Sequence, residues 1–235
     1  MHILDMLVSW EKQVFLLLNS HHSAYGDALI YLFSAPQTWF GVWLAFILLL
    51  FYKKPAREAV LVIIAMGLTI LICDQLTSHI IKPLCMRPRP THYPGVEDIV
   101  KTVYNYRGYP YGFVSSHAAN FFGLATFTAL LFKNRWYSIY IFLIATAVCY
   151  TRIYMGVHFI TDIVPGAIIG ILIGWLIYLC YKEVRIRWLT GSSVITAQKL
   201  FGKILNAWML VLTGFIVFCA TAAIVMKRVV QMVTS

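Results

Sequence analysis

Charged residues are scarce in this sequence, and acidic residues are the scarcest of them. Nine Asp and Glu stand against 19 Lys and Arg, and the four types together make up 12% of the 235 residues. Hydrophobic residues make up 60% of the chain. A soluble domain carries roughly twice this charged fraction. The composition therefore argues against a soluble domain and predicts an all-α, polytopic helical bundle in a membrane.

The sequence also lacks the patterns that mark metal sites and disulfide frameworks. Its five cysteines show no metal-ligand spacing, and four lie in apolar runs, where we expect small buried hydrophobes. No cluster of Asp, Glu and His has the composition of a Mg²⁺ or Zn²⁺ site. Internal repeats are absent, and the N-terminus lacks the basic segment that begins a cleaved signal peptide. We therefore expect no disulfide, no metal, no other cofactor and no cleaved leader.

The net charge of +10 raises the possibility of a nucleic-acid partner. The Lys and Arg residues lie in short loops between apolar stretches, which is the usual arrangement in membrane proteins. We therefore expect the lipid bilayer as a partner and no nucleic acid. The sequence does not determine an oligomeric state.

An amphipathic segment precedes the apolar stretches. Residues 2–19 place apolar side chains on one helical face and Asp5, Glu11 and Lys12 elsewhere. This segment is too polar to span a membrane, so we expect a helix at the membrane interface, followed by a turn around residues 19–26.

About six transmembrane helices should follow this segment. Pro83 should end the second of them and begin a long extended loop over 83–114. The chain then divides into an interfacial segment (1–34), a core that holds the candidate site (35–182), and a basic cytoplasmic connector with the last span (183–235). The predicted spans cover about 35–52, 58–81, 115–132, 136–154, 157–181 and 204–226.

The basic residues also predict the orientation in the membrane. The side with residues 53–57, 133–135 and 182–203 carries ten Lys and Arg, mostly in short loops. The opposite side carries nine, four of which belong to or lie beside the candidate site. We therefore expect the first side to be cytoplasmic. The site then faces the periplasm or exterior of a cell (inner or cytoplasmic) membrane.

The residues from Thr151 to Asp162 interrupt a long apolar run with Arg152, His158 and Asp162. Ionisable groups at a membrane span are costly unless they are paired, so their default interpretation is a functional site. We expect His158 and Asp162 to share one helical face, where the carboxylate activates the imidazole. Gly156 permits a backbone break that would bring Arg152 to the same point.

Two further segments end on the same side of the membrane. One carries Lys82 and Arg89, and the other carries Ser115, Ser116 and His117 at the start of a predicted helix. A helix N-terminus binds anions through its free N–H groups. Three cations beside such a terminus suit a phosphoryl group and the charge that develops during its transfer.

In these three segments the sequence resembles the type 2 phosphatidic acid phosphatase superfamily, the membrane lipid phosphatases related to vanadium haloperoxidases. The first family motif, K-x6-R-P, is complete as Lys82, Arg89 and Pro90. The second, P-S-G-H, is present as Val114-Ser115-Ser116-His117, without its proline and glycine. The third, S-R-x3-G-x-H-x3-D, is complete over 151–162 except that Thr151 replaces the serine. The resemblance covers about residues 30–182.

The resemblance implies an integral-membrane, metal-independent lipid phosphatase that acts through a phosphohistidine. It implies that His158 is the nucleophile, that Asp162 orients it, and that His117 is the general acid. The phosphoryl oxygens would be held by Lys82, Arg89, Ser115, Ser116 and Arg152. Arg87 lies outside the motifs, and we expect it to face lipid headgroups. Candidate substrates are undecaprenyl diphosphate, phosphatidylglycerol phosphate, phosphatidic acid and lipid A phosphate.

Two other functions use some of the same residues. An intramembrane serine protease would use Ser115 or Ser116 with a histidine base, but it gives the three cations no role. A transporter of anionic lipid or phosphate would use the cations. However, such transporters usually have two similar halves with broken helices, and an activated His–Asp pair is superfluous for transport.

Overall fold

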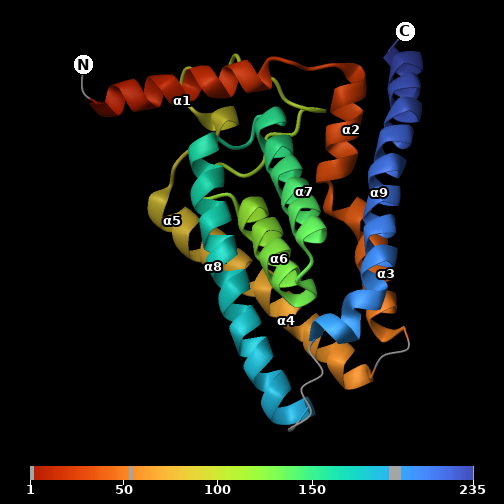
Figure 1. Cartoon of the computed structure of the whole chain (residues 1–235). Helices are drawn as coiled ribbons and strands as arrows, with labels where there is room; N and C mark the ends of the chain where they lie inside the picture. Colours follow the sequence, from red (N-terminus) through yellow and green to blue (C-terminus); the bar gives the residue numbers. More distant parts are fainter. Residues whose placement is uncertain (1–2, 53–54, 191–196, 235) are drawn as a thin grey trace.

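The computed structural model describes residues 3–52, 55–190 and 197–234. Within these ranges the chain is helical and contains no strand; Pro88 and Tyr111 form an isolated antiparallel bridge. The all-α prediction is confirmed. In chain order (Figure 1) the elements are α1 (Ile3–Asn19), α2 (Ala24–Ser34), η1 (Pro36–Trp39), α3 (Phe40–Phe51), α4 (Ala56–Asp74), η2 (Gln75–Ile81), α5 (Lys82–Cys85), η3 (Pro90–His92), α6 (Ser116–Phe132), α7 (Arg135–Tyr154), α8 (Ile160–Arg185), η4 (Ile186–Thr190) and α9 (Ala197–Thr234).

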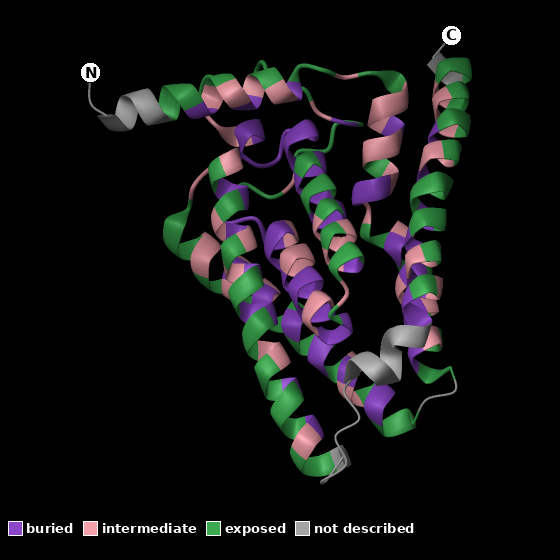
Figure 2. Ribbon diagram, viewed as in Figure 1, coloured by how far each residue is buried: buried purple, intermediate pink, exposed green. Residues whose placement is uncertain are grey.

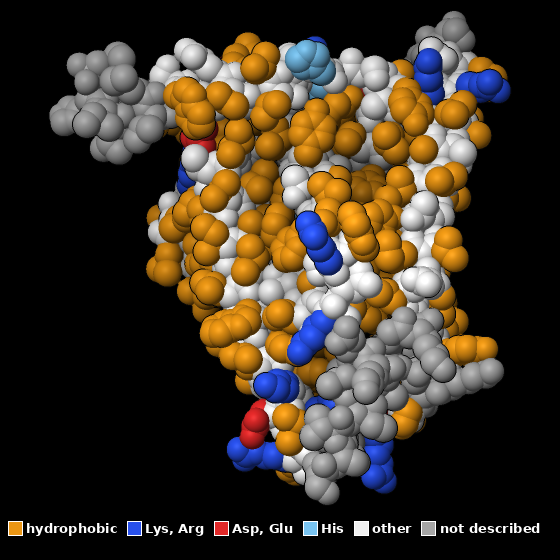
Figure 3. Space-filling view, in the orientation of Figure 1, with side chains coloured by type: hydrophobic (Ala, Val, Ile, Leu, Met, Phe, Trp, Pro, Cys, Tyr) orange, Lys and Arg blue, Asp and Glu red, His pale blue; other side chains and the backbone are white. Residues whose placement is uncertain are grey.

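Several of these helices are long and apolar enough to cross a membrane. Within the described ranges four stretches qualify: Ala56–Cys85, Arg135–Tyr154, Ile160–Trp188 and Ile204–Met232. A fifth arises if Ala24–Ser34 and Pro36–Phe51, which are bent by 61° at their junction, count as one span. Hydrophobic side chains cover most of the face shown in Figure 3. The chain is therefore a multi-pass membrane protein. The remaining predicted span, 115–132, corresponds to α6, an apolar helix of 17 residues that is shorter than these stretches.

The first predicted span, 35–52, corresponds to η1 and α3, but the turn predicted before it is wrong. We expected a turn near 19–26 and a span over 35–52, but helix α2 already begins at Ala24. Its start is capped by the Ser23 side chain, which accepts a hydrogen bond from the Gly26 N–H at 3.0 Å. The helix direction then changes at Ala35 and Pro36. Polar residues around 20–27 concealed a capped helix start.

The predicted end of the second span at Pro83 is also wrong. Helix α4 continues through the π-helix η2 into α5 and ends at Cys85. Pro83 lies just after the point where the hydrogen-bond pattern changes from the π-helix η2 to the α-helix α5. Met86, with a φ of 45°, terminates the helix instead.

Helix α1 lies across one end of the bundle (Figure 1). Glu11, Phe15 and Asn19 are buried, at 5%, 0% and 2% exposure, while Trp10 and Leu17 are 56% and 63% exposed. Spacing by one helical turn puts the three buried residues on one face. Glu11, which the sequence placed off the apolar face of this segment, thus packs inward beside Phe15.

Helix α6 occupies the centre of the bundle and packs against α4, α7, α8 and α9. Its residues are largely buried (Figure 2). Three glycines of α8, at positions 166, 170 and 174, face it. A Cβ added at Gly170 would lie 2.2 Å from the Ala119 carbonyl oxygen, and one at Gly174 would lie 2.3 Å from the Gly123 oxygen. The two backbones are therefore in direct contact, as in small-residue helix pairs of membrane proteins.

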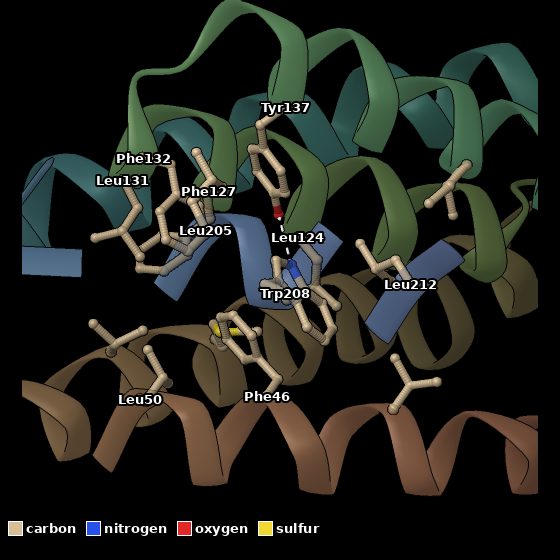
Figure 4. Packing of buried hydrophobic residues seen from close by; sticks show 14 of the residues in the cluster. Phe46, Leu50, Leu124, Phe127, Leu131, Phe132, Tyr137, Leu205, Trp208 and Leu212 are labelled. Carbon is tan, nitrogen blue, oxygen red and sulfur yellow. Dashed lines mark hydrogen bonds between the residues drawn. The ribbon is translucent and has the colours of Figure 1, made fainter. Parts of the chain in front are cut away.

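The opposite end of α6 belongs to a large apolar cluster that also includes α9 (Figure 4). Trp208 of α9 donates a hydrogen bond from its indole nitrogen to the Tyr137 hydroxyl at 3.2 Å. Its ring also packs on Phe46 of α3, with centroids 4.4 Å apart. The cluster thus fixes α9 against α3 and α7, away from the predicted site.

The contact between α6 and α8 predicts a sensitive position. Gly170→Ala should separate the two helices and lower stability by about 1–3 kcal/mol, as overpacking does. Thermal unfolding of the purified protein in detergent measures this effect. Gly67→Ala is the matched control, because a Cβ at this helical glycine of α4 meets nothing within 4 Å. Equal midpoints for the two variants would contradict the proposed role of the contact.

Candidate active site

The two arginines of the first motif are held by a short extended pairing. The Arg89 N–H donates to the Pro110 carbonyl, and the Gly112 N–H donates to the Arg87 carbonyl, each at 2.9 Å. Side chains alternate in extended backbone, so Arg87 and Arg89 project to one side. Both side chains reach the segment 157–162.

Gly156 ends helix α7 in the way that a left-handed residue does. Its φ is +75°, the Val157 N–H donates to the Arg152 carbonyl at 3.0 Å, and the Gly156 N–H donates to the Ile153 carbonyl at 2.9 Å. This pair of hydrogen bonds is the Schellman motif. A Cβ at Gly156 would also lie 2.8 Å from the Lys101 carbonyl oxygen. The glycine thus permits both the turn and the close approach of the loop.

His158 does not lie on the helix where the sequence placed it. Helix α8 begins at Ile160 rather than at 157, so His158 and Asp162 do not share a helical face. They meet because Asp162 lies in the first turn of α8 and points back. Its Oδ2 accepts the Phe159 N–H at 2.9 Å and lies 3.4 Å from His158 Nδ1.

The other ring nitrogen of His158 faces a cation. Arg89 Nη1 lies 3.1 Å from His158 Nε2 and donates to the Val157 carbonyl at 3.0 Å. Burial and the neighbouring cations, Arg89 first among them, hold the pKa of His158 well below its ordinary value. The imidazole is then neutral at pH 7. With its proton on Nδ1, beside Asp162, its Nε2 lone pair points to Arg89, and it can act as a nucleophile once that hydrogen bond is released.

Arg87 contacts protein rather than lipid headgroups, which corrects the sequence-based expectation. Its Nη1 donates to Asp162 Oδ1 at 2.8 Å, and its Nη2 donates to Glu11 Oε2 at 2.5 Å. Its side chain is 25% exposed, whereas that of Asp162 is completely buried. The spacing of Arg87 and Arg89 in the Arg-Pro-Arg-Pro segment could have shown that both side chains project to the same side. The pairing of Arg87 with Glu11, 76 positions away, could not have been found from the sequence.

The residues of the second motif are joined to the end of the second span. Ser116 Oγ contacts the Lys82 ammonium and the hydroxyls of Thr77 and Ser78, the latter two at 2.9 and 2.8 Å. This hydroxyl, in the position of the family's glycine, thus holds Lys82.

Ser115 caps helix α6 rather than lying free at its start. Its Oγ accepts the Ala118 N–H at 3.4 Å, and its own N–H donates to the Asp162 carbonyl at 2.9 Å. We expected the N–H of Ser115 to be free to bind an anion, but it already donates a hydrogen bond to Asp162.

Arg152 and His117 line a cavity of about 240 Å³ with Ser34, Pro36, Tyr106 and other residues. The Arg152 guanidinium donates to Ser34 Oγ, and its Nε has no hydrogen-bond partner among the described residues. The Tyr106 ring lies beneath it, 6.0 Å away. No pattern in the sequence connects Ser34 or Tyr106 with Arg152.

The site therefore contains three cations around one neutral histidine, His158. Burial, followed by the charge of Arg152, lowers the pKa of Arg89 to about 10. In the described part of the chain, no three His, Cys, Asp or Glu residues are placed to hold a metal ion. The arrangement can bind an anion and present a neutral imidazole to it.

The low pKa of His158 predicts a pH effect. Lys82 is one of the cations that lower this pKa, so Lys82→Met should raise it. The acid limb of kcat/KM for a phosphate ester should then move to higher pH, because neutral His158 is required. The same substrate in both enzymes cancels its own ionisation. Lys182→Met, at the exposed end of α8, should leave the limb in place. A limb that stays or moves to lower pH in Lys82→Met would contradict this environment.

Comparison with known proteins matches this arrangement to a family. The family model of the PAP2 superfamily matches residues 58–186. A lipid A 4'-phosphatase of Porphyromonas gingivalis is 42% identical over 214 residues, which cover 91% of this chain and 91% of that protein. A lipid A 4'-phosphatase of Bacteroides thetaiotaomicron is 35% identical over 193 residues, or 82% of this chain and 86% of that protein.

Two solved structures share the fold. The crystal structure of Aquifex aeolicus LpxE has a TM-score of 0.54 and 26% identity, and the match covers 70% of this chain and 92% of that one. The PAP2-type phosphatidylglycerolphosphate phosphatase of Bacillus subtilis has a TM-score of 0.57 at 19% identity, over 78% and 89% of the two chains, and is evidence of fold alone. Since the family model matches more than half of the sequence and two relatives align with most of it, the chain belongs to the PAP2 superfamily.

Proposed function

We propose that this membrane lipid phosphatase hydrolyses a phosphate monoester of a glycolipid of the lipid A type. Two relatives that align with most of the chain are lipid A 4'-phosphatases. We propose the same reaction for this chain, with the 4'-phosphate as the first position to test. Undecaprenyl diphosphate, phosphatidylglycerol phosphate and phosphatidic acid rank behind it.

The observation that carries the proposal is a pair of adjoining cavities with opposite character. The cavity with Arg152 and Tyr106 shares Ser34, Pro36 and His117 with a second cavity of about 250 Å³. The second one continues along apolar side chains: Trp39, Trp43, Ile70, Phe121 and Leu124. A phosphate group in the first and a hydrocarbon chain in the second describe one amphiphilic ligand.

The second cavity is lined in part by an exposed residue of an apolar span. Ile70 lies on α4, within the apolar span Ala56–Cys85, and is 38% exposed. A substrate can therefore enter from the bilayer without passing through water.

For the reaction, we assign His158 Nε2 as the nucleophile that attacks phosphorus. The ester oxygen leaves as the P–O bond breaks and takes a proton from His117. Asp162 stabilises the imidazolium-like ring through its contact with Nδ1. Water then attacks the phosphohistidine and gives a proton to His117 as the P–N bond breaks, which releases phosphate and restores both histidines.

The remaining polar residues would hold the phosphoryl oxygens. Lys82, Arg89 and Arg152 supply positive charge, and Ser115 and Ser116 supply hydroxyls or orient these cations. Arg89 now donates toward Nε2, so its hydrogen bond must pass to a phosphoryl oxygen when substrate binds. This exchange would free the nucleophile only when an anion is present.

We also propose that the protein resides in the cell (inner) membrane with this site toward the periplasm or exterior. The support is the excess of Lys and Arg in the short loops at the opposite end of the bundle.

The lipid substrate can be tested with a variant at the cavity rim. The wild-type enzyme should remove only the 4'-phosphate from a lipid A substrate that carries both phosphates. Mass spectrometry of the lipid product measures which phosphate is lost. Ile70→Trp should narrow the apolar cavity and slow this reaction while it leaves a short water-soluble phosphate ester unaffected. Ile64→Trp, equally lipid-facing on α4 at 52% exposure, is the control. Equal effects on both substrates would exclude the cavity as a lipid site.

The roles of the two histidines predict different dependence on the leaving group. His158→Ala should abolish turnover of every substrate, because it removes the nucleophile. His117→Ala should cost orders of magnitude on a lipid alkoxide but less on an aryl phosphate, whose phenol needs no proton. A pre-steady-state burst of phenol would show that dephosphorylation has become limiting. Equal losses on all substrates without a burst would contradict these roles.

A further inference from the structure

The N-terminal helix α1 contributes a buried carboxylate that the motifs do not account for. Glu11 is 5% exposed. A buried carboxylate is costly unless it is paired and hydrogen-bonded. Both oxygens of Glu11 have partners: Oε2 accepts from Arg87 Nη2 at 2.5 Å, and Oε1 accepts from the Thr161 hydroxyl. These partners belong to the loop before α6 and to the first turn of α8.

Arg87 links this carboxylate to Asp162. Its Nη1 donates to Asp162 Oδ1 at 2.8 Å and to Thr161 Oγ1 at 2.6 Å. The guanidinium also lies over the Phe159 ring, 4.9 Å from the centroid. Because a guanidinium is planar and rigid, contacts on both of its terminal nitrogens fix its orientation.

The orientation of Arg87 in turn determines that of Asp162. A carboxylate is planar, so fixing Oδ1 with Arg87 and Oδ2 with the Phe159 N–H fixes the direction from Oδ2 to His158 Nδ1. The negative charge of Glu11 also balances Arg87, which leaves Asp162 free to polarise the imidazole. Four charged or polarisable groups, Glu11, Arg87, Asp162 and His158, thus form one chain of contacts.

We propose that Glu11 and Arg87 are positioning residues that couple α1 to the His158–Asp162 pair. This proposal rests on the proposed phosphatase function. Helix α1 would then be part of the catalytic unit, although Glu11 lies outside the residues 58–186 that match the family model. Neither residue touches the substrate: Arg87 acts on Asp162, and Glu11 acts through Arg87.

The test is steady-state and single-turnover kinetics of the purified full chain with a phosphate ester. Arg87→Gln and Glu11→Gln should lower kcat and the rate of phosphoenzyme formation, by about 10- to 100-fold for Arg87→Gln, as the loss of outer-shell partners does. KM and vanadate affinity should change little, because the phosphate ligands are intact. The double variant should lose no more than Arg87→Gln alone. Gln13→Ala, on the exposed face of the same helix, should match the wild type.

Chemical rescue separates positioning from folding. The Arg87 side chain is 25% exposed, so guanidinium ions should restore part of the activity of Arg87→Ala. Sodium chloride at equal ionic strength should not. Arg87→Lys should retain more activity than Arg87→Gln at equal thermal stability.

Several outcomes would overturn the proposal. They are a wild-type kcat in both Gln variants, a raised KM with unchanged kcat in Arg87→Gln, additive losses in the double variant, and equal loss in Gln13→Ala. A wild type that hydrolyses no phosphate ester would instead refute the phosphatase function itself.

Discussion

The site depends on the direct contact between the backbones of α6 and α8. The glycines of α8 let α6 approach so closely that the Ser115 N–H can donate to the Asp162 carbonyl at 2.9 Å. This hydrogen bond holds the second motif next to the third. The contact between Ser116 and Lys82 then holds the first motif next to the second. Any residue larger than glycine at 170 would force the helices apart. Helix packing thus determines the positions of groups that belong to three distant segments.

Cations outnumber carboxylates among the buried charges of the site, and this excess of positive charge determines what the site can bind. Lys82, Arg89 and Arg152 are partly or fully buried, and two carboxylates, those of Asp74 and Asp162, lie near enough to act on Lys82. Burying unbalanced cations is costly, and an arriving phosphate dianion removes that cost. The cations are held before substrate arrives, since Ser116, Val157 and Ser34 contact them. Such fixed charges stabilise a transition state without reorganisation.

The sequence predicted the helical class and the residues with motif spacing, because both follow local rules. It missed what depends on contacts between distant segments. Arg87 was assigned to lipid headgroups because its partner, Glu11, lies on a helix whose inward face the apolar pattern did not reveal. Helix α2 was missed because its cap lies in a polar stretch. His158 was placed on a helix because the sequence around it is apolar, whereas the turn at Gly156 delays the helix to Ile160.

The exposed rim at Ile70 has a consequence for how rates are expressed. Under the proposed entry from the bilayer, enzyme and substrate meet by diffusion in two dimensions, so the relevant substrate concentration is a mole fraction in the membrane rather than a molarity in water. Diluting the lipid substrate with inert lipid or detergent at constant bulk concentration would then slow the reaction. Ser34 and Pro36, on either side of the bent junction between α2 and η1, line the same cavity as Ile70. A change in bilayer thickness that alters this bend would therefore also alter the rate.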